Sequence, residues 1–132
     1  MKASNGDTPT YPRIVSFAFA SPASSTGVGS WIDEREAWEM SLKGWVGLHV
    51  ETEPGVYYEI IFYDPVRLRQ TMESAVEGEG TPCFAEYAPL VLLPEVTVEA
   101  VENSVKYLWE QDYFSYWKPD EKLKPPENNT SL

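Results

Sequence analysis

Residues 37–65, AWEMSLKGWVGLHVETEPGVYYEIIFYDP, contain the longest regular pattern in the chain. Apolar side chains stand at every second position from Trp38 to Val50, apart from Gly44, and this is the spacing of a β-strand with one apolar face. Residues 56–63 are rich in aromatic and β-branched side chains, which favour strands. The Glu-Pro-Gly sequence at 53–55 indicates a turn between the two runs. The stretch therefore predicts a β-hairpin.

A register with Thr52 opposite Val56 gives this hairpin two different faces. One face collects large apolar side chains, namely Val46, Leu48, Val50, Tyr58, Ile60 and Phe62. The other face is aromatic and acidic, with Trp45 opposite Tyr63, Gly47 opposite Ile61, His49 opposite Glu59, and Glu51 opposite Tyr57. We expect the first face to form the core and the second to form a surface.

The segments around the hairpin predict further elements, with helix caps and apolar periodicity as the main signals. Asp64 and Pro65 suit the start of one helix, and Thr97 suits the start of another. Residues 31–36 form either a helical turn or an acidic segment that leads into the long strand. The other expected elements are a strand at 13–20, a loop at 21–30, a short strand at 90–93 and an aromatic cluster at 113–117.

This order, β-β-β-α-β-α, predicts an α+β fold. We expect an antiparallel sheet of about four strands with two helices packed on one face. That face would carry five apolar side chains of the hairpin stretch, namely Leu42, Val46, Leu48, Ile60 and Phe62.

A chain of 132 residues is suited to one domain with one core. We expect a flexible N-terminus at 1–10, a single domain at 11–117 and a disordered polar tail at 118–132. Cys83 is the only cysteine, so no internal disulfide can form. The polar start and the lack of a long apolar run predict a cytoplasmic protein without a membrane span.

The formal net charge is -11 and the sequence pI is about 4.4. Such a surface repels nucleic acid and anionic lipid and attracts basic proteins at long range. The charge could also serve only to keep the protein dispersed in water. We expect no nucleic-acid and no membrane partner.

The sequence contains few groups suited to catalysis. His49 is the only histidine, so a metal site with two imidazoles is excluded. Opposite Glu59 it could act as a general base, although a lone histidine and glutamate on a sheet face form a polar cross-strand pair more often. No phosphate-binding motif and no DxDxDG calcium loop occurs. We therefore predict no catalytic residue, no metal ligand and no cofactor.

The outer face of the hairpin is the predicted binding surface. Aromatic anchors within a rim of one charge sign are typical of protein–protein contacts with a basic partner. The predicted contact residues are Trp45, His49, Glu51, Tyr57, Glu59 and Tyr63, with Glu53, Asp33 and Glu34 at the rim. Alternatively, residues 21–30 or 113–117 cover these aromatic side chains.

The outline resembles the small acidic immunity proteins of bacterial polymorphic toxin systems. The similar features are the strand-turn-strand GLHVETEPGVYYEIIFYDP, the helix start at Asp64, Pro65 and Leu68, and the LVLL strand followed by an amphipathic helix. The resemblance implies a non-catalytic cytoplasmic inhibitor that binds a basic toxin domain, commonly a nuclease.

Two other classes stay open. One is a small enzyme with His49 and Glu59, or another carboxylate, as its base. The other is an adaptor or homo-oligomeric subunit, such as a homodimer, that pairs through the outer sheet face. A concave pocket containing His49 would favour an enzyme, whereas an exposed aromatic and acidic face without a pocket would favour an inhibitor.

Overall fold

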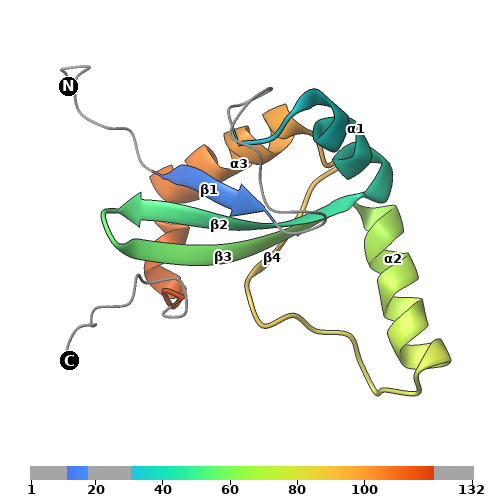
Figure 1. The fold of residues 1–132 in the computed structure, drawn as a ribbon. Helices are drawn as coiled ribbons and strands as arrows, with labels where there is room; N and C mark the ends of the chain where they lie inside the picture. The colour runs from blue at the N-terminus through green and yellow to red at the C-terminus, as the bar shows by residue number, and fades with distance from the viewer. Residues whose placement is uncertain (1–11, 18–30, 121–132) are drawn as a thin grey trace, which may run out of the picture.

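The computed structural model describes residues 12–17 and 31–120 and shows an α+β fold (Figure 1). Three strands, β1 (Arg13–Phe17), β2 (Trp45–Glu53) and β3 (Val56–Tyr63), lie side by side, and β4 (Leu90–Leu92) pairs with β3. The helices are α1 (Glu34–Lys43), α2 (Pro65–Glu73) with its π-helical end η2 (Ser74–Gly78), α3 (Val98–Glu110) and the 3-10 turn η3 (Tyr113–Tyr116).

The hairpin of β2 and β3 has the predicted register along its length. Val46 faces Phe62, Leu48 faces Ile60 and Val50 faces Tyr58. The turn differs, because Glu53 rather than Thr52 lies opposite Val56, and a bulge between Glu51 and Glu53 absorbs the extra residue.

The sheet is mixed, so the expectation of an antiparallel sheet is wrong at one edge. β4 runs parallel to β3, with Ile61 opposite Leu90 and Tyr63 opposite Leu92. A parallel neighbour requires a long crossover. Residues 64–89, which include α2, provide it by carrying the chain away from the sheet and back to the same end (Figure 1).

The predicted strand from Trp38 to Lys43 is a helix instead. Asp33 accepts a hydrogen bond from the Glu36 N–H while the Glu36 side chain accepts one from the Asp33 N–H, and this capping box begins α1. Gly44, at φ 76°, ends it. Alternate apolar residues also satisfy the i, i+4 spacing of a helix, which is why the pattern was misleading.

As a result, Leu42 does not belong to the core. Trp38 and Leu42 are one turn apart on the outer side of α1 and are 62% and 67% exposed, whereas Met40 is fully buried. α2 begins at Asp64 and Pro65 as predicted, but none of its residues is buried.

The core lies between the sheet and the helices α1 and α3, which Figure 1 shows on one side of the strands. It contains Val46, Leu48, Val50, Ile60 and Phe62 from the hairpin, Met40 from α1, and Val101, Val105 and Leu108 from α3. Within the described ranges, no helix has both the length and the apolar character needed to cross a bilayer.

Candidate functional site

The outer face of the hairpin carries the predicted cross-strand pairs. Trp45 faces Tyr63, His49 faces Glu59, and Glu51 faces Tyr57. In the part of the chain that the structure describes, other segments cover the two ends of this face, and its middle opens into a pocket.

The Tyr63 end is covered by the segment before β4. Tyr63 is 4% exposed, its hydroxyl donates to Glu86 Oε2 at 2.8 Å, and the Phe84 ring packs edge-on with its centroid 5.9 Å away. Burial, with a smaller contribution from Glu86, raises the pKa of Tyr63 to about 12. Trp45 stacks on Tyr63, and the Arg67 guanidinium lies over the Trp45 ring. These aromatic side chains stabilise the fold at this end.

The cover at the Tyr63 end differs from one of the two alternatives considered above, the segment 113–117. Residues 84–86 provide it, rather than 113–117, and the 21–30 loop lies outside the described residues. Phe114 of η3 packs edge-on against Tyr58, whose side chain is on the helix side of the sheet. The segment 113–117 therefore closes the core.

The Glu51 end is occupied by a structural ion pair. Glu51 is buried, accepts hydrogen bonds from the Arg13 guanidinium and from the Gly55 N–H, and so joins β1, β2 and the hairpin turn. The hydrogen bond from Arg13 is the main reason that the pKa of Glu51 lies below its usual value. Glu53 is exposed beside the turn.

Two predicted rim residues, Asp33 and Glu34, lie on the other side of the sheet. They follow the buried Trp31, whose indole N–H donates to Glu102 of α3 at 2.8 Å. Asp33 caps α1 and Glu34 is in its first turn. Neither belongs to the outer face.

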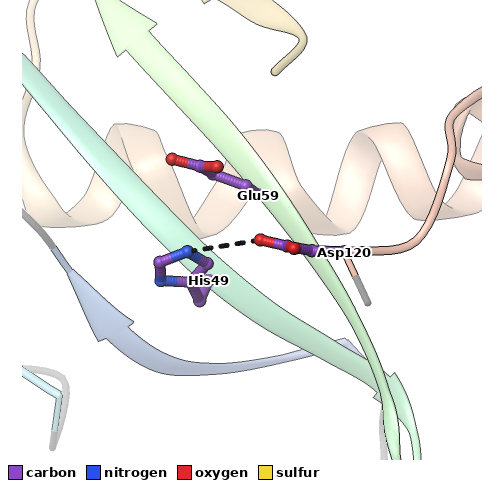
Figure 2. Close-up of side chains that lie close together, drawn as sticks. All are labelled: His49, Glu59 and Asp120. Atoms are coloured by element: carbon purple, nitrogen blue, oxygen red, sulfur yellow. Dashed lines mark ion pairs between the residues drawn. The ribbon is translucent and has the colours of Figure 1, made fainter. Parts of the chain in front are cut away.

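The middle of the outer face holds three polar side chains, His49 from β2, Glu59 from β3 and Asp120 from the C-terminal segment (Figure 2). The Asp120 carboxylate lies 3.8 Å from His49 Nε2, and one ligand-type atom from each residue lies within 4.8 Å of the other two. On the far side of the imidazole, Nδ1 is 3.2 Å from the Ser16 hydroxyl of β1. Within the described parts of the chain, these three side chains form the candidate site.

The C-terminal segment reaches the site along the free part of the β3 edge. The Asp120 N–H donates to the Tyr57 carbonyl at 2.7 Å, whereas β4 occupies the same edge at Ile61 through a bond to the Pro89 carbonyl. Residues 118–120, assigned above to the polar tail, thus add an ordered contact beside the sheet.

A pocket of about 990 Å³ opens between these two edge segments. Its polar floor is His49, Glu59 and Asp120, and its walls are Tyr87, Ala88, Pro89, Trp117, Lys118 and Pro119. The His49 and Asp120 side chains are each 19% exposed. A half-buried imidazole and two carboxylates in a pocket whose walls are apolar apart from Lys118 form a site suited to a cation.

Sequence reasoning found His49 and Glu59 but not Asp120. The hairpin register places the first two opposite each other, whereas Asp120 reaches them only through a contact distant in sequence. The aromatic run at 113–117 was the one signal, because it indicated that the C-terminal segment folds back.

Comparison of the chain with protein-family models, with curated proteins and with solved structures gives no match. The functional assignment therefore depends on the site itself.

Proposed function

We propose that this chain is a non-catalytic acidic binding protein of the immunity type, which binds a basic protein domain and neutralises it. A pocket containing His49 was the feature expected of an enzyme, so the observation that carries the proposal is instead the pair of carboxylates, Glu59 and Asp120, on the floor of that pocket. Its location, in the middle of the predicted binding face, is consistent with a role in partner contact.

The pocket has the chemistry needed to accept a lysine or arginine side chain from a partner. Trp117 and Pro119 supply apolar surface for the methylene stem, while the carboxylates of Glu59 and Asp120 can accept hydrogen bonds from the charged head. A charged pair that loses its water in such a pocket is typical of residues that dominate binding energy.

The overall charge supports the same partner class. A net charge of -11 attracts basic domains at long range and accelerates their association, and added salt weakens this attraction. The fully exposed Tyr87 at the mouth of the pocket gives such a partner an aromatic contact.

A second candidate is a hydrolase, because a pocket containing His49 is also what an enzyme requires. The His49 ring lies between the Ser16 hydroxyl and the Asp120 carboxylate, which is the spatial order of nucleophile, base and acid in a catalytic triad. Ser16, however, does not line the pocket, and 3.8 Å between Asp120 and His49 exceeds a hydrogen-bond distance. The geometry therefore favours binding over catalysis.

The neighbouring reading frames test the proposal: we expect one of them to encode a large protein, whose C-terminal domain is then co-expressed with this chain. We expect a toxic domain, growth rescue by this chain, and a one-to-one complex whose association slows as salt rises. Glu59→Lys should lose rescue and reduce that salt dependence, whereas the matched control Glu110→Lys, on the exposed end of α3, should retain rescue. Absence of a complex, or equal rescue by Glu59→Lys, would contradict the proposal.

The hydrolase is tested separately with p-nitrophenyl acetate as substrate. Turnover that disappears in both Ser16→Ala and His49→Gln would support an enzyme. We expect the wild-type chain to release p-nitrophenol no faster than Ser16→Ala does.

A further inference from the structure

We propose that His49, Glu59 and Asp120 together bind one divalent first-row metal ion, with Zn²⁺ and Mn²⁺ as the best candidates. The inference does not depend on the proposed function, but it uses the same carboxylates, so a bound ion and a partner's lysine or arginine side chain would compete for the pocket. One nitrogen and two carboxylate groups would hold the ion at the floor of the outer-face pocket (Figure 2).

The spacing of the ligand atoms is close to that of a metal site. Bonds from zinc to nitrogen and oxygen are about 2.0–2.2 Å long, so two ligand atoms of a tetrahedral ion are about 3.4 Å apart. Here His49 Nε2 and Asp120 Oδ2 are 3.8 Å apart, and all three atoms lie within 4.8 Å of one another. The widest pair of ligand atoms must therefore approach by at most about 1.4 Å to bind an ion, which side-chain rotation of the two carboxylates can supply.

Ser16 prepares the imidazole for this role. Its hydroxyl lies 3.2 Å from His49 Nδ1 and can accept a hydrogen bond from a protonated Nδ1. That tautomer leaves the lone pair on Nε2, the nitrogen that faces Asp120. A second hydrogen bond that fixes the tautomer and the ring orientation is a regular feature of metal-binding histidines.

The charge of the cluster also favours a cation. Glu59 is half-buried, and although Lys118 lines the same pocket, among residues 12–17 and 31–120 no side chain or backbone N–H donates a hydrogen bond or an ion pair to the Glu59 carboxylate. Placing it beside the half-buried Asp120 brings two negative groups together. A divalent ion would neutralise both charges and give the Glu59 carboxylate a partner in place of the water that it loses.

The backbone holds the three ligands in place before any ion binds. His49 and Glu59 are directly paired across β2 and β3, and Asp120 is fixed to β3 by the bond from its N–H to the Tyr57 carbonyl. The pocket above them leaves coordination positions for water or for an external ligand. This is the arrangement of a site with three protein ligands and an open position.

The ligand set selects among metals. Calcium requires six to eight oxygen ligands, and thiolate-seeking ions require cysteine or methionine. One imidazole with two carboxylates suits Zn²⁺, Mn²⁺ or Fe²⁺ better, and Zn²⁺ and Mn²⁺ can be handled in air.

Calorimetric titration of the full chain, freed of metal with EDTA, with ZnCl₂ and MnCl₂ tests the proposal. We expect one ion per chain for at least one of the two metals. Glu59→Gln, Asp120→Asn and His49→Gln should each lower the affinity at least tenfold, and Ser16→Ala about tenfold. Glu110→Gln, which removes one exposed charge on the helix side, should leave the affinity unchanged.

Circular dichroism of each variant separates loss of the site from loss of the fold. A spectroscopic readout with CoCl₂ provides a second measurement, because visible absorption bands report the ligands and geometry. Absence of wild-type binding tighter than millimolar for both metals, or equal binding by all three ligand variants, would overturn the proposal.

Discussion

The Asp120 carboxylate lies 3.8 Å from Nε2 of His49 and completes a polar cluster that begins in the centre of the hairpin. A backbone contact at the sheet edge holds the two residues together, since the Asp120 N–H donates to the Tyr57 carbonyl. Tyr57 and Glu59 are two positions apart on β3, so their side chains lie on the same face of the sheet. The candidate site is therefore assembled from the most regular element of the fold and from its C-terminal segment.

Removal of the C-terminal segment should abolish metal binding at the site while leaving the protein folded. A chain ending at Trp117 loses Asp120 but keeps the core contacts of Phe114 and Trp117, so we expect a cooperative unfolding transition with at least a tenfold loss of Zn²⁺ or Mn²⁺ affinity. A chain ending at Asp120 is the control and should bind as the full chain does. Equal affinities for the two truncated chains would show that Asp120 is not a ligand.

Protonation of Glu51 should make the protein less stable in acid. Because its pKa is lowered on folding, mainly by Arg13, its contribution to the unfolding free energy is complete above the usual value of 4.5 and is lost as the pH falls through the folded value. Glu51→Gln should cost about 1 kcal/mol near pH 7. Urea unfolding at several pH values should show the gap to wild type closing below pH 4.5.

Glu53→Gln is the control for this effect, since Glu53 is exposed at the end of the same strand. It should change stability little at any of these pH values. A gap between wild type and Glu51→Gln that stays constant with pH would mean that the Arg13 pair does not contribute as described.

Tyr63 should make the protein less stable in alkali. Its pKa rises from 10.0 to about 12 on folding, so between these values the unfolded chain loses the phenolic proton before the folded chain does, and the unfolding free energy falls as pH rises. Tyr63→Phe should remove this component, at a cost of about 1 kcal/mol near pH 7 for the lost bond to Glu86.

The measurement is urea unfolding between pH 9 and about pH 11.5, combined with ultraviolet titration of the tyrosinate band. The wild-type titration should contain a late step that is absent from Tyr63→Phe. Parallel stability profiles for the two proteins would contradict the burial of a protonated hydroxyl beside Glu86.

Gly44 should be the least replaceable glycine among those in the left-handed region. It adopts φ 76°, and a Cβ there would lie 2.6 Å from Asp64 Oδ2. Gly44→Ala therefore combines the cost of the left-handed backbone, about 1–2 kcal/mol, with a clash against the cap of α2. Gly55→Ala is a matched control, since Gly55 has φ 84° with no atom within 4 Å of the added carbon.

Chemical denaturation of both variants measures the difference. We expect Gly44→Ala to lose clearly more unfolding free energy than Gly55→Ala does. Equal losses would mean that Asp64 moves away at no cost and that the contact between α1 and the start of α2 is loose.

Local physics was sufficient to predict part of this fold. The pairing of Leu48 with Ile60 and of His49 with Glu59 follows from side-chain alternation, and the helix starts at Asp64 and Thr97 follow from capping. In α1, alternation was misleading because Trp38 and Leu42, one helical turn apart, suit a helix as well as a strand, whereas Met40 lies on the opposite, buried side of the helix. There the capping box of Asp33 and Glu36 was the stronger signal.

Contacts distant in sequence account for the rest. The covering of Tyr63 by Phe84 and Glu86, the burial of Glu51 by Arg13, and the approach of Asp120 to His49 depend on how irregular segments return to the sheet. No periodic pattern in the sequence predicts such contacts. As a result, Tyr63 and Glu51, which were expected on the binding face, instead stabilise the fold. The site also contains Asp120, which was assigned to the disordered tail.

The central claim is that the His49, Glu59 and Asp120 pocket binds a cation. X-ray diffraction from crystals grown with ZnCl₂ or MnCl₂, recorded at the absorption edge of the metal, tests it most directly. The account predicts one strong anomalous peak at bonding distance, about 2.0–2.2 Å, from His49 Nε2 and from an oxygen of each carboxylate. Metal peaks found only elsewhere on the molecule, or an ordered pocket without a peak at saturating metal, would contradict it.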